Sequence, residues 1–247
     1  MFINIYNEFE NRKEEINNYF NHLHLYETNA INTIYTKKED YKINKTILYT
    51  NLKSSMIIML YNLVEAITSK CIREIHFEIN NSNKKYNDFN KEIKLILVRY
   101  YYHCCEKKND INNITKDLTE LIEFTKENRS VSIEYENFIK FYPMISGNLD
   151  AREIRKILQK YGLKFLNECP KLKLVKDYRN KLAHGEMSFE EVGRYLSFEE
   201  LQVMLKETFS FMDAMINSVD EFIIKKKYLN KSSSKRKHKN RRFINGY

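Results

Sequence analysis

Apolar residues recur every three or four positions along most of this chain, the spacing that places them on one side of an α-helix. In the first such segment, residues 2–25, they include Phe2, Ile5, Phe9 and Ile16. The longest segment, residues 44–79, contains neither Gly nor Pro, which predicts a long and largely buried helix. The same spacing predicts further helices over residues 89–106, 115–128 and 198–229.

Capping residues mark the helix ends in the second half of the chain. Asp150, followed by Glu153, predicts a helix start, and Gly162 predicts its end. Pro170 predicts the first turn of a helix that continues to His184 and stops at Gly185. Two Ser-x-x-Glu capping boxes follow, formed by Ser188 with Glu191 and by Ser197 with Glu200.

Residues 131–148, VSIEYENFIKFYPMISGN, show no clear helical spacing. Because VSIEY alternates apolar and polar residues, it predicts a short strand or an ordered loop. The expected fold is therefore an all-α helical bundle with one short irregular insertion. Only 5 Gly and 2 Pro occur in 247 residues, which argues against an all-β sandwich or barrel.

The cysteine pattern and the apolar runs narrow the class of protein. The four cysteines show neither metal-ligand spacing nor a disulfide framework, so we expect a cytoplasmic protein with no metal and no cofactor. The N-terminal residues carry charges early and do not resemble a signal peptide. The longest unbroken apolar run, residues 56–60, is too short to span a bilayer, so no membrane partner is expected.

The formal net charge of +9 belongs to the C-terminal end of the chain. Residues 225–247 hold ten Lys and Arg and no acidic residue, which leaves 32 basic against 33 acidic residues in 1–224. We expect a domain over residues 1–230 and a disordered basic tail over 231–247. The tail is either solubilising or an RNA-gripping arm that uses Lys235, Arg236, Lys237, Arg241 and Arg242.

The stretch KDYRNKLAHG, residues 176–185, holds candidate chemistry. Arg179 can bind a phosphate, and His184, in the last helical turn, is favoured as imidazolium by the helix dipole. Asn180 adds an amide donor and acceptor. Five steps of about 100° place Arg179 and His184 roughly 140° apart around a straight helix. They converge only if the helix end unwinds, the Arg side chain wraps round, or a second subunit supplies its own copy.

YRNKLAHG resembles the signature of the HEPN superfamily of helical nucleases, an Arg followed by a polar residue and then a His four to six positions after the Arg. Segments 57–66, 146–162 and 179–201 are similar, in that order, to prokaryotic HEPN-like nucleases found near defence genes. The resemblance covers most of residues 1–225. It implies an all-α homodimer whose two motifs meet in a cleft between the subunits.

The resemblance also implies a reaction, the metal-independent cleavage of RNA. The 2′-hydroxyl attacks the adjacent phosphate and leaves 2′,3′-cyclic phosphate and 5′-hydroxyl ends. His184 would be the general acid or base, Arg179 would stabilise the pentavalent phosphorus, and Asn180 would orient the phosphate or the His. Glu65, in an otherwise apolar helix, would hold Arg179 in place, and Lys181 and Arg152 would contact RNA.

Several interpretations of these residues remain open. The chain is expected to be an endoribonuclease that acts as a toxin or antiphage effector, with an antitoxin or defence protein as partner. The alternative is a non-catalytic HEPN module that binds RNA or a protein. A third alternative is a scaffold whose only affinity for nucleic acid comes from the tail. Arg179 and His184 can be an ordinary exposed helix end, Glu65 a structural ion-pair partner, Asp150 a helix cap only, and Arg152 part of a solvated face.

Overall fold

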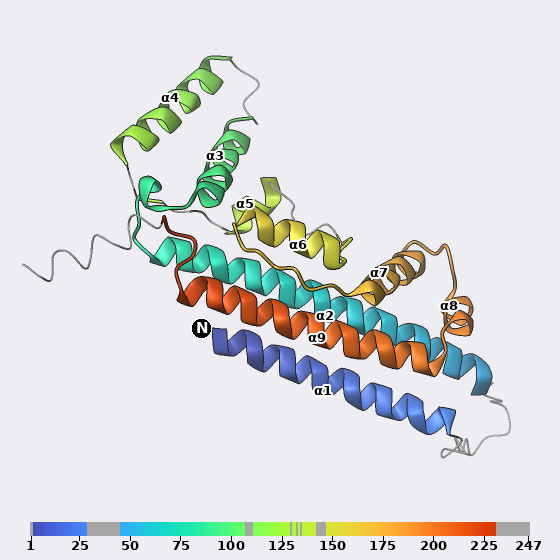
Figure 1. Ribbon diagram of the computed structural model, residues 1–247. Helices are drawn as coiled ribbons and strands as arrows, with labels where there is room; N and C mark the ends of the chain where they lie inside the picture. The colour runs from blue at the N-terminus through green and yellow to red at the C-terminus, as the bar shows by residue number, and fades with distance from the viewer. Residues whose placement is uncertain are drawn as a thin grey trace, which may run out of the picture. The chain divides into compact units, whose positions relative to one another are not determined.

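The computed structural model describes residues 2–28, 45–106, 111–128, 130, 131, 133, 135–141 and 147–230. These residues contain no strand, which confirms the all-α class (Figure 1). The helices are α1 (Phe2–Glu27), α2 (Lys45–Asn81), α3 (Lys91–Glu106), α4 (Ile111–Glu127), α5 (Tyr135–Phe141), α6 (Ala151–Lys160), α7 (Pro170–Ala183), α8 (Phe189–Tyr195) and α9 (Phe198–Ile224), with a 3-10 turn at Tyr86–Asp88.

Most predicted helix starts are confirmed. The Asp150 carboxylate accepts a hydrogen bond from the Glu153 N–H at 2.9 Å and caps α6. Both Ser-x-x-Glu capping boxes form, at the starts of α8 and α9. In the 131–148 stretch the predicted strand or loop is only partly correct, because residues 135–141 form α5.

The described residues 130, 131 and 133 form single pairings instead of a strand. Ser130 pairs with Lys85 in an isolated β-bridge. The Ile133 backbone exchanges two hydrogen bonds with the Asn80 side-chain amide, each 2.8 Å long. The segment therefore gains its backbone partners from the end of α2 and the loop that follows α2.

Helix α9 ends five residues before the predicted position 229. Lys226 adopts a left-handed conformation, with φ of 48°. The Lys227 N–H donates to the Phe222 carbonyl and the Lys226 N–H to the Ile223 carbonyl, both at 2.9 Å. These bonds form a Schellman motif, which usually places Gly at the left-handed position. No Gly marks this helix end in the sequence, because a lysine occupies that position.

The chain divides into two compact units, and α2, α6 and α9 contribute residues to both. The first unit contains residues 1–69, 147–153 and 167–216; the second contains 70–146, 154–166 and 217–247. The expectation of one domain over residues 1–230 stays a prediction.

In the first unit, α1 lies alongside the N-terminal parts of α2 and α9 (Figure 1). The Tyr19 hydroxyl of α1 donates to the Leu52 carbonyl of α2 at 2.8 Å. Phe20 of α1 stacks on Phe198 of α9 with ring centroids 4.6 Å apart. Apolar residues of all three helices are buried in this core, among them Phe9, Ile16, Leu60, Val64, Leu201 and Met212.

Helix α8 approaches the backbone of α2 closely in the same unit. A Cβ atom at Gly193 would lie 1.9 Å from the Thr50 carbonyl oxygen, so only glycine fits there. The Lys53 ammonium donates to the Leu196 carbonyl at 2.5 Å, just after α8. These contacts fix the segment that follows α7.

In the second unit, α3 packs against α4 and α5. His76, near the end of α2, is buried and its Nε2 lies 2.7 Å from the Tyr161 hydroxyl. The His76 ring also contacts Phe138 of α5, with centroids 4.6 Å apart. Phe89, Phe222 and Tyr228 form a further buried aromatic group.

Helix α2 is the one helix of the described residues whose length and apolar composition would allow it to cross a membrane. The prediction from the sequence rested only on the longest unbroken apolar run, residues 56–60, and therefore did not identify α2 as long and apolar enough to cross a membrane. Of its most apolar 18-residue window, 56% is buried inside the protein. Core helices of soluble proteins meet the same two criteria, so the property is weak evidence for a span.

Candidate functional site

Helix α7 carries the candidate motif, and it begins and ends where the sequence predicts. Pro170 occupies the first turn, where its missing N–H costs no hydrogen bond. His184 is the C-cap residue, with φ of −91° and ψ of −1°. Gly185 adopts φ of +70°, and the next N–H, from Glu186, donates to the Lys181 carbonyl at 2.9 Å. The helix therefore stays wound up to His184.

Arg179 is held by four groups from three segments of the first unit. Its Nη1 donates to the Gly147 carbonyl and to Asn180 Oδ1, each at 3.0 Å. Its Nη2 lies 3.7 Å from Glu65 Oε2, and its guanidinium carbon lies 4.3 Å from the centre of the Tyr61 ring. The Arg179 side chain remains 24% exposed, so the guanidinium is fixed in place and still accessible.

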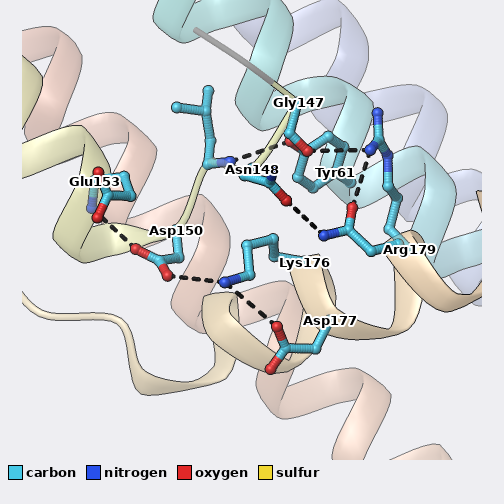
Figure 2. Close-up of polar contacts among 10 residues, drawn as sticks. Tyr61, Gly147, Asn148, Asp150, Glu153, Lys176, Asp177 and Arg179 are labelled. Carbon is cyan, nitrogen blue, oxygen red and sulfur yellow. Dashed lines mark hydrogen bonds and ion pairs between the residues drawn. The ribbon is translucent and has the colours of Figure 1, made fainter. Parts of the chain in front are cut away.

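Figure 2 shows that the segment Gly147–Asp150 faces α7, and every residue of the segment makes at least one polar contact. Besides the Gly147 carbonyl, Asn148 Oδ1 accepts from Asn180 Nδ2 at 2.6 Å. The Leu149 N–H donates to the buried Tyr61 hydroxyl at 3.1 Å. We call these four residues the 147–150 segment.

The 147–150 segment ends in a partly buried ion pair. Asp150 Oδ2 lies 3.2 Å from the Lys176 ammonium, which also lies 3.3 Å from Asp177 Oδ1. Burial opposes the charge on Asp150, but the Glu153 N–H and Lys176 outweigh it and lower the pKa of Asp150. Burial likewise opposes the charge on Lys176, and its two carboxylate partners raise the pKa of Lys176. Asp150 is thus both the predicted helix cap and a link to α7.

The other predicted site residues are more exposed. His184 is exposed at the end of α7, and Lys181 is exposed one turn earlier. Arg152 is exposed on α6. No contact brings His184 to Arg179 within the part of the chain that the structure describes. The predicted tail residues Lys235, Arg236, Lys237, Arg241 and Arg242 lie outside the described residues.

The sequence interpretation placed Arg179, Asn180 and Glu65 in one site, and the structure brings these three together. It missed Tyr61, Asn148 and the backbone of Gly147 as parts of that site. Tyr61 precedes Glu65 by four residues, so the helical repeat places both on one face of α2. No comparable signal in the sequence indicated that Asn148 lies against Asn180.

The arrangement can bind an anion at Arg179. A guanidinium has five N–H donors, and two of them are used by hydrogen bonds within the described part of the chain. The remaining donors can form charge-assisted hydrogen bonds to a phosphate. Glu65, at 3.7 Å, balances the charge of Arg179 without occupying those donors by a short hydrogen bond. Among the described residues, no group of three or more His, Cys, Asp or Glu side chains could hold a metal ion.

The helical fold and the Arg–x4–His motif at the end of α7 are those expected of the HEPN class. A family model, the HEPN_MAE_28990-like HEPN, matches residues 1–228, and the chain belongs to this family. Comparisons with curated proteins and with solved structures found no match.

Proposed function

We propose that this HEPN protein is a metal-independent endoribonuclease and that Arg179 binds the scissile phosphate. The main support is the geometry of Arg179. The Gly147 carbonyl and the Asn180 amide hold its guanidinium in a position that is still partly exposed. HEPN membership supports this choice of chemistry, because many HEPN domains cleave RNA. A preorganised cation of this kind stabilises the charge that develops on a pentavalent phosphate.

In the proposed reaction, the 2′-oxygen forms a bond to phosphorus as the bond from phosphorus to the 5′-oxygen breaks. A general base accepts the 2′-hydroxyl proton, and a general acid gives a proton to the leaving 5′-oxygen. The products are a 2′,3′-cyclic phosphate and a 5′-hydroxyl. His184 supplies one of these proton-transfer groups, because its exposed imidazole lies at the end of the helix that carries Arg179.

The proposed active form is a homodimer. Helix α7 remains wound between Arg179 and His184, so the two side chains point about 140° apart around its axis. A second subunit that presents its own α7 would bring His184 of one chain near Arg179 of the other. The proposed cellular setting is the cytoplasm, with an antitoxin or a defence protein as partner.

The test is cleavage of a labelled RNA pool in EDTA. We expect Arg179→Ala and His184→Ala each to lower the rate about 100-fold or more. Arg12→Ala and His22→Ala, matched changes on α1, should cleave like wild type. Equal cleavage by all five proteins would refute this site. If wild type binds RNA but never cleaves it, the protein is a non-catalytic HEPN module.

A mixing experiment tests the shared site. Arg179→Ala and His184→Ala chains, each inactive alone, are unfolded together, refolded and assayed. Mixed dimers contain one intact Arg179 and one intact His184, so part of the activity should return. Failure to regain activity in mixtures that sizing shows to be dimeric would exclude a site shared between subunits.

A further inference from the structure

Arg179, Asn180 and Asn148 form a continuous chain of hydrogen bonds. The Arg179 Nη1 donates to Asn180 Oδ1 at 3.0 Å, and Asn180 Nδ2 donates to Asn148 Oδ1 at 2.6 Å. A guanidinium can only donate hydrogen bonds, so it forces the oxygen of Asn180 to face it. The amide nitrogen of Asn180 must then face Asn148, which must accept. The direction of the whole chain is therefore set by Arg179.

We propose that Asn148 is a positioning residue for RNA cleavage, which acts through Asn180 to orient the Arg179 guanidinium; this inference rests on the proposed nuclease function. The rest of the 147–150 segment fixes Asn148. The Gly147 carbonyl accepts from Arg179, the Leu149 N–H donates to Tyr61, and Asp150 pairs with Lys176. A residue tied on both sides in this way constrains its partner more than a lone surface amide would.

The donor and acceptor pattern makes a specific prediction for aspartate substitutions. In Asn148→Asp, the new carboxylate still accepts from Asn180. In Asn180→Asp, the carboxylate still accepts from Arg179, and the Asn148 amide can turn and donate to it. In the double variant, two carboxylates face each other where the wild-type contact is 2.6 Å, and neither has a proton to donate.

The experiment measures kcat and KM for an RNA substrate with the two single variants and the double variant. Each single variant should lower kcat less than about tenfold, and the double variant at least about tenfold more than the product of the two. KM should rise less than kcat falls, because Arg179 contacts the phosphate of the bound RNA but stabilises it most in the transition state. Asn21→Asp, on α1, is the control for an added negative charge.

A pH profile gives an independent readout. When one of the two facing carboxyls takes up a proton, it becomes a donor and the chain of hydrogen bonds is restored. The kcat of the double variant should therefore recover as the pH falls from 8 to 5.5, relative to wild type. The single variants should show no such recovery. Asn148→Ala, which removes an exposed side chain, should lower kcat about tenfold and serves as the variant least able to disturb folding.

The outcomes separate this inference from the proposed function. If wild type does not cleave RNA, the nuclease proposal fails, and the same four proteins are compared for affinity to a 2′-O-methylated RNA. The Asn148–Asn180–Arg179 chain then still predicts that the double variant binds at least about tenfold more weakly than the single effects combined. Single effects that simply multiply, without recovery at low pH, would overturn the role of Asn148.

The second unit contains a pocket of about 380 Å³, a volume within the range of small-ligand sites. One face of α3 and the residues beside it line the pocket: Lys91, Lys94, Leu95, Val98, Tyr86 and Asn230. The four α3 residues follow the i, i+3, i+4, i+7 spacing of a single helix face. The pocket therefore combines two cations with an apolar side chain, Leu95, that is 47% exposed.

We infer that this pocket binds RNA, with phosphates at Lys91 and Lys94 and a base against Leu95 and Tyr86. The Lys94 ammonium lies 5.3 Å from the centre of the Tyr86 ring, so a cation and an aromatic ring are already in contact at this pocket. Asn230 is anchored at the pocket by bonds to the carbonyls of Asp88 and Asn87, at 2.8 and 3.0 Å. The chain continues from Asn230 into residues 231–247, which hold seven Lys and Arg and no acidic residue.

Fluorescence anisotropy with a 2′-O-methylated RNA tests the pocket without relying on cleavage. Lys91→Glu/Lys94→Glu should weaken binding at least about tenfold and lower the slope of log affinity against log salt by about two. Leu95→Ala should weaken binding without changing that slope. The control, Lys116→Glu/Lys126→Glu on α4, makes the same charge change at two lysines that do not line the pocket. Equal losses in both double variants would show a general charge effect and overturn the pocket site.

Discussion

Protonation of His76 should destabilise the fold in mild acid. The ring is 1% exposed, its Nε2 is paired with the Tyr161 hydroxyl, and its Nδ1 has no hydrogen-bond partner among the described residues. Burial lowers the pKa of His76 from 6.5 to about 3. The unfolded chain therefore takes up a proton near pH 6.5, whereas the folded chain does not until the pH is far lower.

The magnitude follows from linkage between proton binding and folding. Because the folded pKa is depressed, the stability is complete above pH 6.5 and is lost as the pH falls toward 3. At pH 5, the pH lies about 1.5 units below the pKa of His76 in the unfolded chain. Protonation then stabilises the unfolded chain by about 2 kcal/mol, at 1.36 kcal/mol per unit. That loss is a large fraction of the stability of an ordinary domain.

The assay is urea unfolding followed by far-UV circular dichroism, at pH values from 7.5 to 5, for wild type and His76→Phe. The phenyl ring keeps most of the packing, although it removes the contact with the Tyr161 hydroxyl at every pH. Titration of carboxylates affects both proteins and cancels in the difference between them. Wild type should lose about 2 kcal/mol more than His76→Phe between pH 7.5 and 5. Parallel pH curves for the two proteins would refute the argument.

Further predictions concern the segment after α7. Gly193→Ala should destabilise the protein by about 3 kcal/mol or more in urea unfolding, because the new Cβ would lie 1.9 Å from the Thr50 carbonyl oxygen. Gly185→Ala meets no atom within 4 Å but keeps φ of +70°, so it should cost about 1 kcal/mol; equal costs at both glycines would contradict the steric argument. Ser188→Ala should cost about 1 kcal/mol by removing the bond to the Glu191 N–H, and an unchanged melting curve would show that the cap contributes nothing.

The sequence predicted the helices well where local chemistry decides their limits. Asp150, Ser188 and Ser197 each accept the expected N–H at a helix start. The end of α9 was predicted too late because Lys226 adopts the left-handed conformation that normally signals itself by Gly. Helix α5 was missed because it has only seven residues, too few for an apolar period to stand out.

The candidate site was predictable only where its residues are neighbours in sequence. Arg179 and Asn180 were found because the motif places them side by side. Gly147 and Asn148 contact them from 32 residues away, and no periodicity or capping rule encodes such a contact. Glu65 was identified as a carboxylate in an apolar helix, and its role as a loose ion-pair partner of Arg179 depends on tertiary packing.

The charges around Arg179 have a consequence for selectivity among anions in the cell. Arg179 and Lys176 contribute two positive charges, and Glu65, Asp150 and Asp177 contribute three negative charges within the same contacts. The site therefore lacks the excess positive potential that concentrates small anions. Inorganic phosphate and free nucleotides should therefore bind weakly at Arg179. A polymer that is held by contacts elsewhere on the protein can still reach Arg179. Millimolar phosphate should thus inhibit the proposed RNA cleavage little.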